Sequence, residues 1–109
     1  CGDIPSQSYY DEMVKIANEF PQVKFLAMTK SRRIDFTVKA DNLQMMASLW
    51  GSYRWDGADH MPKTDIRFRS EKKTRKIHAN EYHCPADCVK CGRVCWHIVA
   101  GKTVVFDQH

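Results

Sequence analysis

Apolar residues recur every three or four positions near the start of the chain. This spacing predicts an amphipathic helix over residues 6–20. Ser8 and Asp11 lie at the separation of a capping pair, and Pro21 predicts the end of the helix because proline cannot continue it. The residues that follow the helical spacing are Tyr10, Met13, Val14, Ala17 and Phe20.

The next apolar segments predict strands. Residues 23–28 and 43–50 are short, nearly continuous apolar runs, which are typical of strands covered on both faces. Residues 64–68 predict a further strand, and residues 96–106 predict a β-hairpin or a turn into a final strand. Residues 51–61, between the second and third of these four segments, predict a loop that carries large side chains. A helix followed by buried strands favours an α/β fold.

Four of the five cysteines fall between residues 84 and 95. A secreted disulfide framework spreads an even number of cysteines along the chain, so this cluster favours metal-bound thiolates in a reducing, cytoplasmic setting. No apolar run approaches the roughly 18 residues of a membrane span, so we expect no membrane partner. The candidate metal ligands are Cys84, Cys88, Cys91 and Cys95, with His83 and His97 as possible substitutes.

The centre of this cluster, from Cys88 to Gly92, has the Cys-x-x-Cys-Gly form of a zinc knuckle, in which glycine permits the tight turn. A continuous helix would spread the thiols over roughly 16 Å at 1.5 Å per residue, too far to share one ion. The chain must therefore loop back to give Zn²⁺ four ligands. A [4Fe-4S] cluster is the alternative cofactor, and buried thiols without a metal are a third reading. The first three cysteines also match the spacing of radical SAM enzymes, although only 18 residues follow Cys91 here.

Basic residues concentrate between residues 63 and 76. The segment carries an excess of five positive charges over Asp65 and Glu71, in a chain whose net charge is +4. Phosphate backbones attract such clusters, and Tyr53, Trp55 and Phe68 are nearby aromatic residues that can stack on unpaired bases. A nucleic-acid interface, a site for an acidic partner protein and a solvated loop all remain open. The basic residues are Lys63, Arg67, Arg69, Lys72, Lys73, Arg75 and Lys76.

Few other residues suggest catalysis. Asp56, Asp59 and His60 fit either a small acid–base or metal group or the local hydrogen bonds of a turn. The Gly101-Lys102-Thr103 segment lacks the upstream glycine of a phosphate-binding loop. No small-molecule substrate is evident, so we expect a protein that acts by binding.

The length of 109 residues fits a single domain. We divide it into an α/β core (1–62), a basic loop (63–76), a metal-binding segment (83–97) and a final strand (98–109).

Several segments of the chain match the pattern of one known family: Cys1-Gly2-Asp3, Ser8-x-Tyr10, the helix end at Pro21, 25–31, 91–96, 104–106 and His109. Together they resemble the gene-product-eighty-eight family, which is borne by phages and plasmids. The resemblance implies a mobile-element origin, a small α/β, partial-barrel-like core and a chain that corresponds to the C-terminal half of longer members. A βαβ core is the other arrangement that we expect.

With the cysteine cluster, the resemblance favours a small metal-stabilised viral protein that acts on nucleic acid or on a host protein that handles nucleic acid, such as a defence nuclease. The alternative is an iron–sulfur enzyme or enzyme fragment.

Overall fold

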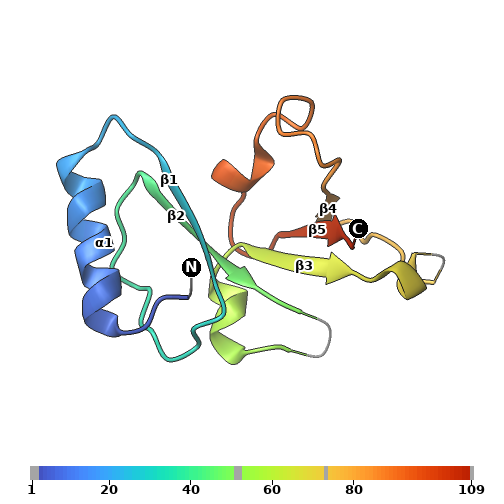
Figure 1. The fold of residues 1–109 in the computed structure, drawn as a ribbon, viewed down its shortest axis with the longest axis horizontal. Helices are drawn as coiled ribbons and strands as arrows, with labels where there is room; N and C mark the ends of the chain where they lie inside the picture. The colour runs from blue at the N-terminus through green and yellow to red at the C-terminus, as the bar shows by residue number, and fades with distance from the viewer. Residues whose placement is uncertain (1–2, 51–52, 73, 109) are drawn as a thin grey trace.

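A five-stranded parallel sheet forms the centre of the computed structural model, which describes residues 3–50, 53–72 and 74–108 (Figure 1). The strand order is β1-β2-β3-β5-β4, and every neighbouring pair is parallel. β1 and β4 are the two edges, so the sheet is open. The strands are β1 (Phe25–Thr29), β2 (Leu43–Ser48), β3 (Lys63–Arg67), β4 (Glu81–His83) and β5 (Thr103–Asp107).

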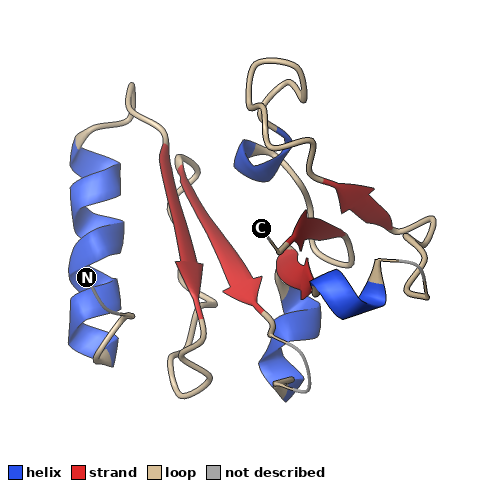
Figure 2. Ribbon diagram, turned by 45° about the vertical axis from the view of Figure 1, so that its right-hand side comes forward, coloured by secondary structure: helices blue, strands red, loops and turns tan. Residues whose placement is uncertain are grey.

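The α/β class is confirmed, but the βαβ core is wrong. The one α-helix of the described residues, α1 (Gln7–Glu19), precedes β1 and lies along the β1–β2 side of the sheet (Figure 2). In the described parts of the connections between strands, the only helical structure is 3₁₀ turns. These turns are η1 (Asp56–His60), η2 (Arg69–Glu71) and η3 (Val94–Trp96).

Hydrogen bonds from outside the helix fix both ends of α1. Ser6, rather than the predicted Ser8, is the N-cap residue: its hydroxyl accepts from the backbone N–H of Tyr9 at 3.3 Å. At the other end, the Asn42 amide lies 2.7 to 2.9 Å from the carbonyl oxygens of Ala17, Phe20 and Val23. Because Asn42 directly precedes β2, these contacts join the end of the helix to the start of a strand.

The face of the sheet that α1 covers, here called the helix-side face, carries Leu43, Met45 and Ala47 of β2. Tyr10 of α1 is 1% exposed; it packs edge-on against Phe36 with ring centroids 4.8 Å apart. Its hydroxyl donates to the Val38 carbonyl at 2.6 Å. The β1–β2 and β2–β3 connections therefore complete this core, through the buried residues Phe36, Ala40, Trp55, Ala58 and Met61.

The opposite face, here called the cysteine-side face, carries Gln44 and Met46 of β2 and Val104 of β5. Met46 and Val104 have no exposed surface. The segment between β4 and β5, residues 84–102, reaches this face, where the Gln44 amide donates to the Ile98 carbonyl at 2.7 Å. The cysteine segment thus contributes cover that a helix usually provides in a parallel sheet.

Three sequence predictions need correction. Met28 of the edge strand β1 is 44% exposed, so this strand is not covered on both faces. The segment 63–76 begins with β3 rather than forming a loop throughout. For residues 96–106, the hairpin is wrong and the alternative, a turn into a final strand, is confirmed. In the described residues β5 runs parallel to β3 and to β4, a strand that the sequence reading missed.

The strands predicted over residues 23–28, 43–50 and 64–68 are confirmed within a few residues of their ends. The expected loop of residues 51–61 contains η1, and its Gly51 and Ser52 lie outside the described residues.

Candidate functional site

The cysteine segment starts from the sheet. Cys84 directly follows β4, and its backbone N–H donates to the Val105 carbonyl of β5 at 2.8 Å. The Ala86 N–H points at the Cys84 sulfur from 3.4 Å. Such N–H donors stabilise a thiolate, the form of cysteine that binds metals.

A tight turn holds Cys88 and Cys91. The Asp87 carboxylate accepts from the backbone N–H groups of Val89 and Lys90, both at 3.1 Å. Gly92 has φ +68°, which agrees with the turn predicted from Cys-x-x-Cys-Gly, and Arg93 continues it with φ +59°. The Arg93 N–H then closes on the Cys88 carbonyl at 3.2 Å. The segment is therefore not a continuous helix.

Cys95 lies in η3, on the return path of the chain towards the sheet. Burial raises the pKa of its thiol, and the charges of Cys84, Cys91 and Cys88 raise it further. Burial also raises the pKa of Tyr82, and Cys91, Cys84 and Cys95 all contribute to that shift. The Cys95 thiol therefore lies within electrostatic reach of the other three thiols, and the Tyr82 phenol within reach of Cys84, Cys91 and Cys95. Within residues 3–50, 53–72 and 74–108, however, no group of three or more Cys, His, Asp or Glu side chains is arranged to hold a metal ion.

The two histidines beside the cluster differ. His83 Nε2 lies 2.8 Å from Asp107 Oδ2, on the helix-side face, whereas Cys84 follows on the other side of the strand. His97 is exposed, and its Nε2 lies 3.4 Å from the Gly92 carbonyl, beside the knuckle. Of the two substitutes, only His97 is on the side of the thiols.

The His83 contact belongs to a charged network at the carboxyl ends of β3, β5 and β4. Arg67 holds Asp107 with two hydrogen bonds, from Nε at 2.7 Å and from Nη2 at 3.0 Å. These bonds, with that of His83, hold the pKa of the Asp107 carboxyl well below its usual range. Asp107 is therefore ionised and accepts the Nε2–H of His83, which leaves Nδ1 as the ring's free nitrogen.

A second part of this network surrounds Asp65 of β3. The Asp65 carboxylate is 6% exposed and accepts from Arg54 at 3.0 Å and Arg75 at 3.2 Å. Arg75 also donates to Glu81 at 2.9 Å. Buried carboxylates need such partners, so these arginines neutralise the β3–β5–β4 half of the helix-side face.

The basic segment accordingly divides into two groups. The first group forms ion pairs with carboxylates of the fold: Lys63 with Asp59 at 2.8 Å, Arg67 with Asp107, and Arg75 with Asp65. Arg69, Lys72 and Lys76 are exposed and form no ion pair with any described residue, while Lys73 lies outside the described residues. Only this second group is available to an external anion.

The aromatic residues near the segment also differ from the prediction. Trp55 is 7% exposed and belongs to the core, so it offers no open stacking face. Tyr53 is half-buried, and its hydroxyl donates to the Lys30 carbonyl at 2.6 Å. Trp50, which the sequence reading assigned to a buried strand, is 49% exposed. It packs edge-on against Phe68, with ring centroids 5.6 Å apart.

Asp56, Asp59 and His60 lie on η1. Hydrogen bonding to Lys63 lowers the pKa of Asp59, which is thus part of an ion pair. This contact favours the structural interpretation of the group.

The family model of gene product 88 matches residues 1–81, which is more than half of the chain. The chain belongs to the gene product 88 family. This assignment confirms the resemblance and the phage-type character of the protein. No curated protein and no solved structure matches the chain.

The matched part of this gene product 88 family member includes α1, β1, β2, β3 and the exposed basic residues, and ends at the first residue of β4. The four clustered cysteines lie beyond it, although the sequence reading extended the resemblance to the end of the chain. Correspondence to the C-terminal half of longer members stays a prediction. In the part of the chain that is described, no helix is both long and apolar enough to cross a membrane.

The Asp107 network predicts an acid-dependent stability. Because the pKa of Asp107 is lowered in the folded protein, its contribution to the free energy of unfolding is fully present above about pH 4 and is lost as pH falls towards the folded value. Asp107→Asn should therefore lower the free energy of unfolding at pH 6. Between pH 4.5 and pH 2.5, the free energy of unfolding of this variant should fall by less than that of the wild type. Urea unfolding at each pH measures both effects. Asp41→Asn, an exposed carboxylate without an ion pair among the described residues, is the control; an acid dependence that Asp107→Asn leaves unchanged would contradict the assignment.

Proposed function

We propose that this phage-type protein binds single-stranded nucleic acid at the carboxyl ends of β1, β2 and β3, and that a zinc ion on the cysteine segment braces the sheet behind that surface. The observation that carries the proposal is the exposed Trp50–Phe68 pair, with unpaired cations on the elements next to it.

The aromatic pair has a position suited to stacking. Trp50 follows the end of β2 and Phe68 follows the end of β3, so both lie at the edge of the sheet where parallel strands end. Ligands commonly bind at this edge of open α/β sheets. Phe68 supports one edge of the Trp50 ring system, while half of the Trp50 surface stays open to a base.

Cations lie both before and after the Trp50–Phe68 pair along the chain. Lys30 follows β1, and its ammonium group lies 3.0 Å from the Ser48 hydroxyl of β2. Arg69 follows Phe68, and Lys72 and Lys76 lie on the connection that leaves it. The nearest acidic residue in this stretch, Glu71, accepts from the Phe68 backbone N–H at 3.0 Å. The surface therefore combines an open aromatic ring with cations that form no ion pair with any described residue. One carboxylate, Asp3, lies beside them and accepts from the backbone N–H of Lys30.

Single strands fit this surface better than duplexes. A stacking platform needs unpaired bases, and every base offers a π-face, so binding of this kind tolerates many sequences. An acidic partner protein would use the cations but would not require the Trp50 ring. That difference separates the two candidate partners.

The zinc proposal rests on the donor set. Cys84, Cys88, Cys91 and Cys95 are free thiols, and the Asp87 turn and the sheet fix three of them. A bound dication stabilises four thiolates, which otherwise repel one another. Zn²⁺ in such a site is structural, and it favours the folded state of the loop that covers the sheet.

Trp50→Ala should weaken binding of an oligothymidylate by about 5- to 150-fold, since base–aromatic stacking contributes ~1–3 kcal/mol per base. Tyr9→Ala, which removes an aromatic side chain that is 55% exposed on α1, is the matched control and should leave the affinity unchanged. Fluorescence anisotropy with a labelled oligonucleotide measures both variants.

The double variant Lys72→Gln/Lys76→Gln should also lower the slope of log affinity against log salt by about 1.4. Equal affinities for Trp50→Ala and the wild type would contradict the proposal, and retained salt dependence without any Trp50 effect would favour an acidic protein partner.

Purified protein should contain one zinc ion per chain, and Cys88→Ser should lose it. His83→Gln should retain the zinc, because the His83 ring contacts Asp107 on the face opposite to the thiols. Elemental analysis after anaerobic purification measures the metal content of each variant. A brown protein with iron and sulfide in stoichiometric amounts would instead establish the iron–sulfur alternative.

A further inference from the structure

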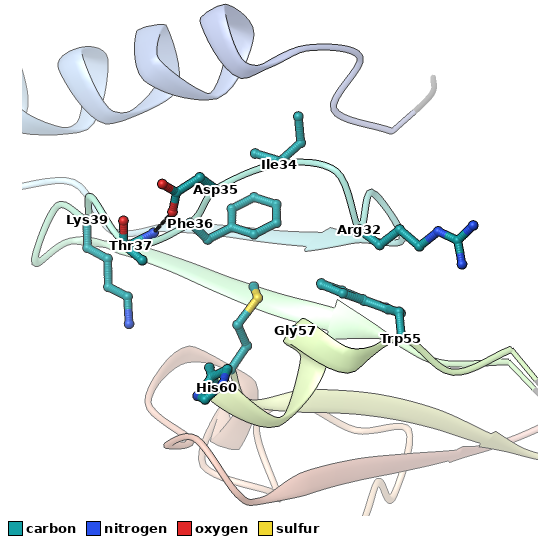
Figure 3. Close-up of a pocket in the computed structure, with 10 residues that line it drawn as sticks. Arg32, Ile34, Asp35, Phe36, Thr37, Lys39, Trp55, Gly57 and His60 are labelled. Carbon is teal, nitrogen blue, oxygen red and sulfur yellow. Dashed lines mark hydrogen bonds between the residues drawn. The ribbon is translucent and has the colours of Figure 1, made fainter.

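A groove on the helix-side face lies between the β1–β2 connection and η1 (Figure 3). Its volume is about 230 Å³, and its lining is mainly apolar. Figure 3 shows Arg32 at one end and Lys39 at the other, with Phe36 and Trp55 between them. None of the functions discussed above uses this groove.

Trp55 and Phe36 contribute to the apolar wall of the groove. They are 7% and 8% exposed, so only a small part of each ring borders the groove. The Trp55 indole N–H is buried without an acceptor in the described part of the chain, and it therefore reports on changes at this wall. Gly57 lets η1 lie close to this ring, because a Cβ at residue 57 would come within 3.2 Å of the Trp55 ring carbon Cζ3.

The charges at the ends of the groove favour an anion. Arg32 and Lys39 are exposed, line the groove and form no ion pair with any residue of the ranges described. The single carboxylate in the lining, Asp35, accepts from the Thr37 backbone N–H at 2.9 Å. Because one cation lies at each end, the groove suits a flat group with a negative charge on both sides.

Tyr53 connects this groove to the Trp50 surface. It forms an isolated bridge with Trp50, and its hydroxyl donates to the carbonyl of Lys30, two residues before Arg32. A strand stacked on Trp50 therefore passes close to the Arg32 end of the groove.

We infer that the groove takes one nucleotide unit of the bound strand, with its base against the apolar wall to which Phe36 and Trp55 contribute, and with the two flanking phosphates at Arg32 and Lys39. This inference rests on the proposed function. A nucleotide inside a strand has a phosphate on each side, whereas a free mononucleotide has only one. The positions of the two cations therefore favour the strand as the source of the nucleotide.

The indole N–H signals of the ¹⁵N-labelled 109-residue chain test the inference. Trp55→Phe and Trp50→Phe assign the signals of those two residues among the three tryptophans. Titration with oligothymidylate should shift the Trp55 signal together with that of Trp50, and thymidine monophosphate at the same nucleotide concentration should shift it far less. Arg32→Gln/Lys39→Gln should weaken oligothymidylate binding at least fivefold, while Arg33→Gln, an exposed neighbour outside the groove lining, should not.

The outcomes separate this inference from the proposed function. A Trp50 signal that shifts while that of Trp55 stays fixed overturns the groove assignment and leaves the Trp50 surface in place. A Trp55 signal that responds equally to the monophosphate and the oligonucleotide overturns the strand as the source. If the monophosphate shifts Trp55 but the oligonucleotide does not bind, the proposed function fails and the strand assignment fails with it.

Discussion

A parallel sheet must be covered on both faces, and the described residues of this chain contain one α-helix, of 13 residues, with which to cover it. α1 and the first two connections cover the helix-side face of β1 and β2. On the other face, Met46 and Val104 have no exposed surface, although no helix lies over them in the described structure. The cysteine segment contributes to their cover. Its one helical element is the short turn η3, and its internal backbone hydrogen bonds are local contacts between residues three to five apart. Its shape depends on the Asp87 turn, on the Gln44–Ile98 contact and, in our proposal, on zinc.

The other half of the helix-side face is stabilised by charge. In the part of the chain that the structure describes, no α-helix lies over β3, β5 and β4. Asp65, Glu81 and Asp107 occupy this face, and Arg54, Arg67 and Arg75 neutralise them. This arrangement explains why the basic segment does not act as one patch. Its inward cations belong to the fold, and among its described residues only the outward cations, Arg69, Lys72 and Lys76, remain for a partner. The same arrangement leaves the proposed nucleic-acid surface at the edge of the sheet, where the strands end.

The elements with strong local patterns could be predicted from the sequence. The helical spacing from Tyr10 to Phe20 and the apolar run from Leu43 gave α1 and β2, because each pattern reports burial on one element. β4 was missed because three residues, Glu81 to His83, carry too short a pattern, and the parallel pairing of β5 depends on partners far away in the sequence.

The site was less predictable for a related reason. The thiol positions and the turn at Gly92 follow from local spacing. The pairing of Arg67 with Asp107, 40 residues away, and the exposure of Trp50 are set by the sheet topology, which no local pattern contains. The sequence predicts a buried Trp50 and an accessible Trp55, and the structure shows the reverse for the same reason. η1 and the β1–β2 connection bury Trp55, while the end of β2 leaves Trp50 exposed.

Amide hydrogen exchange of the metal-loaded protein, before and after chelation, tests most directly whether the cysteine segment is a metal-held cover for the sheet. Our account predicts that chelation speeds exchange of the Met46 and Val104 amides at least tenfold, because β2 and β5 lose the cover of their cysteine-side face, while the amides in the middle of α1 change less. Unchanged exchange of Met46 and Val104 after chelation would contradict the account.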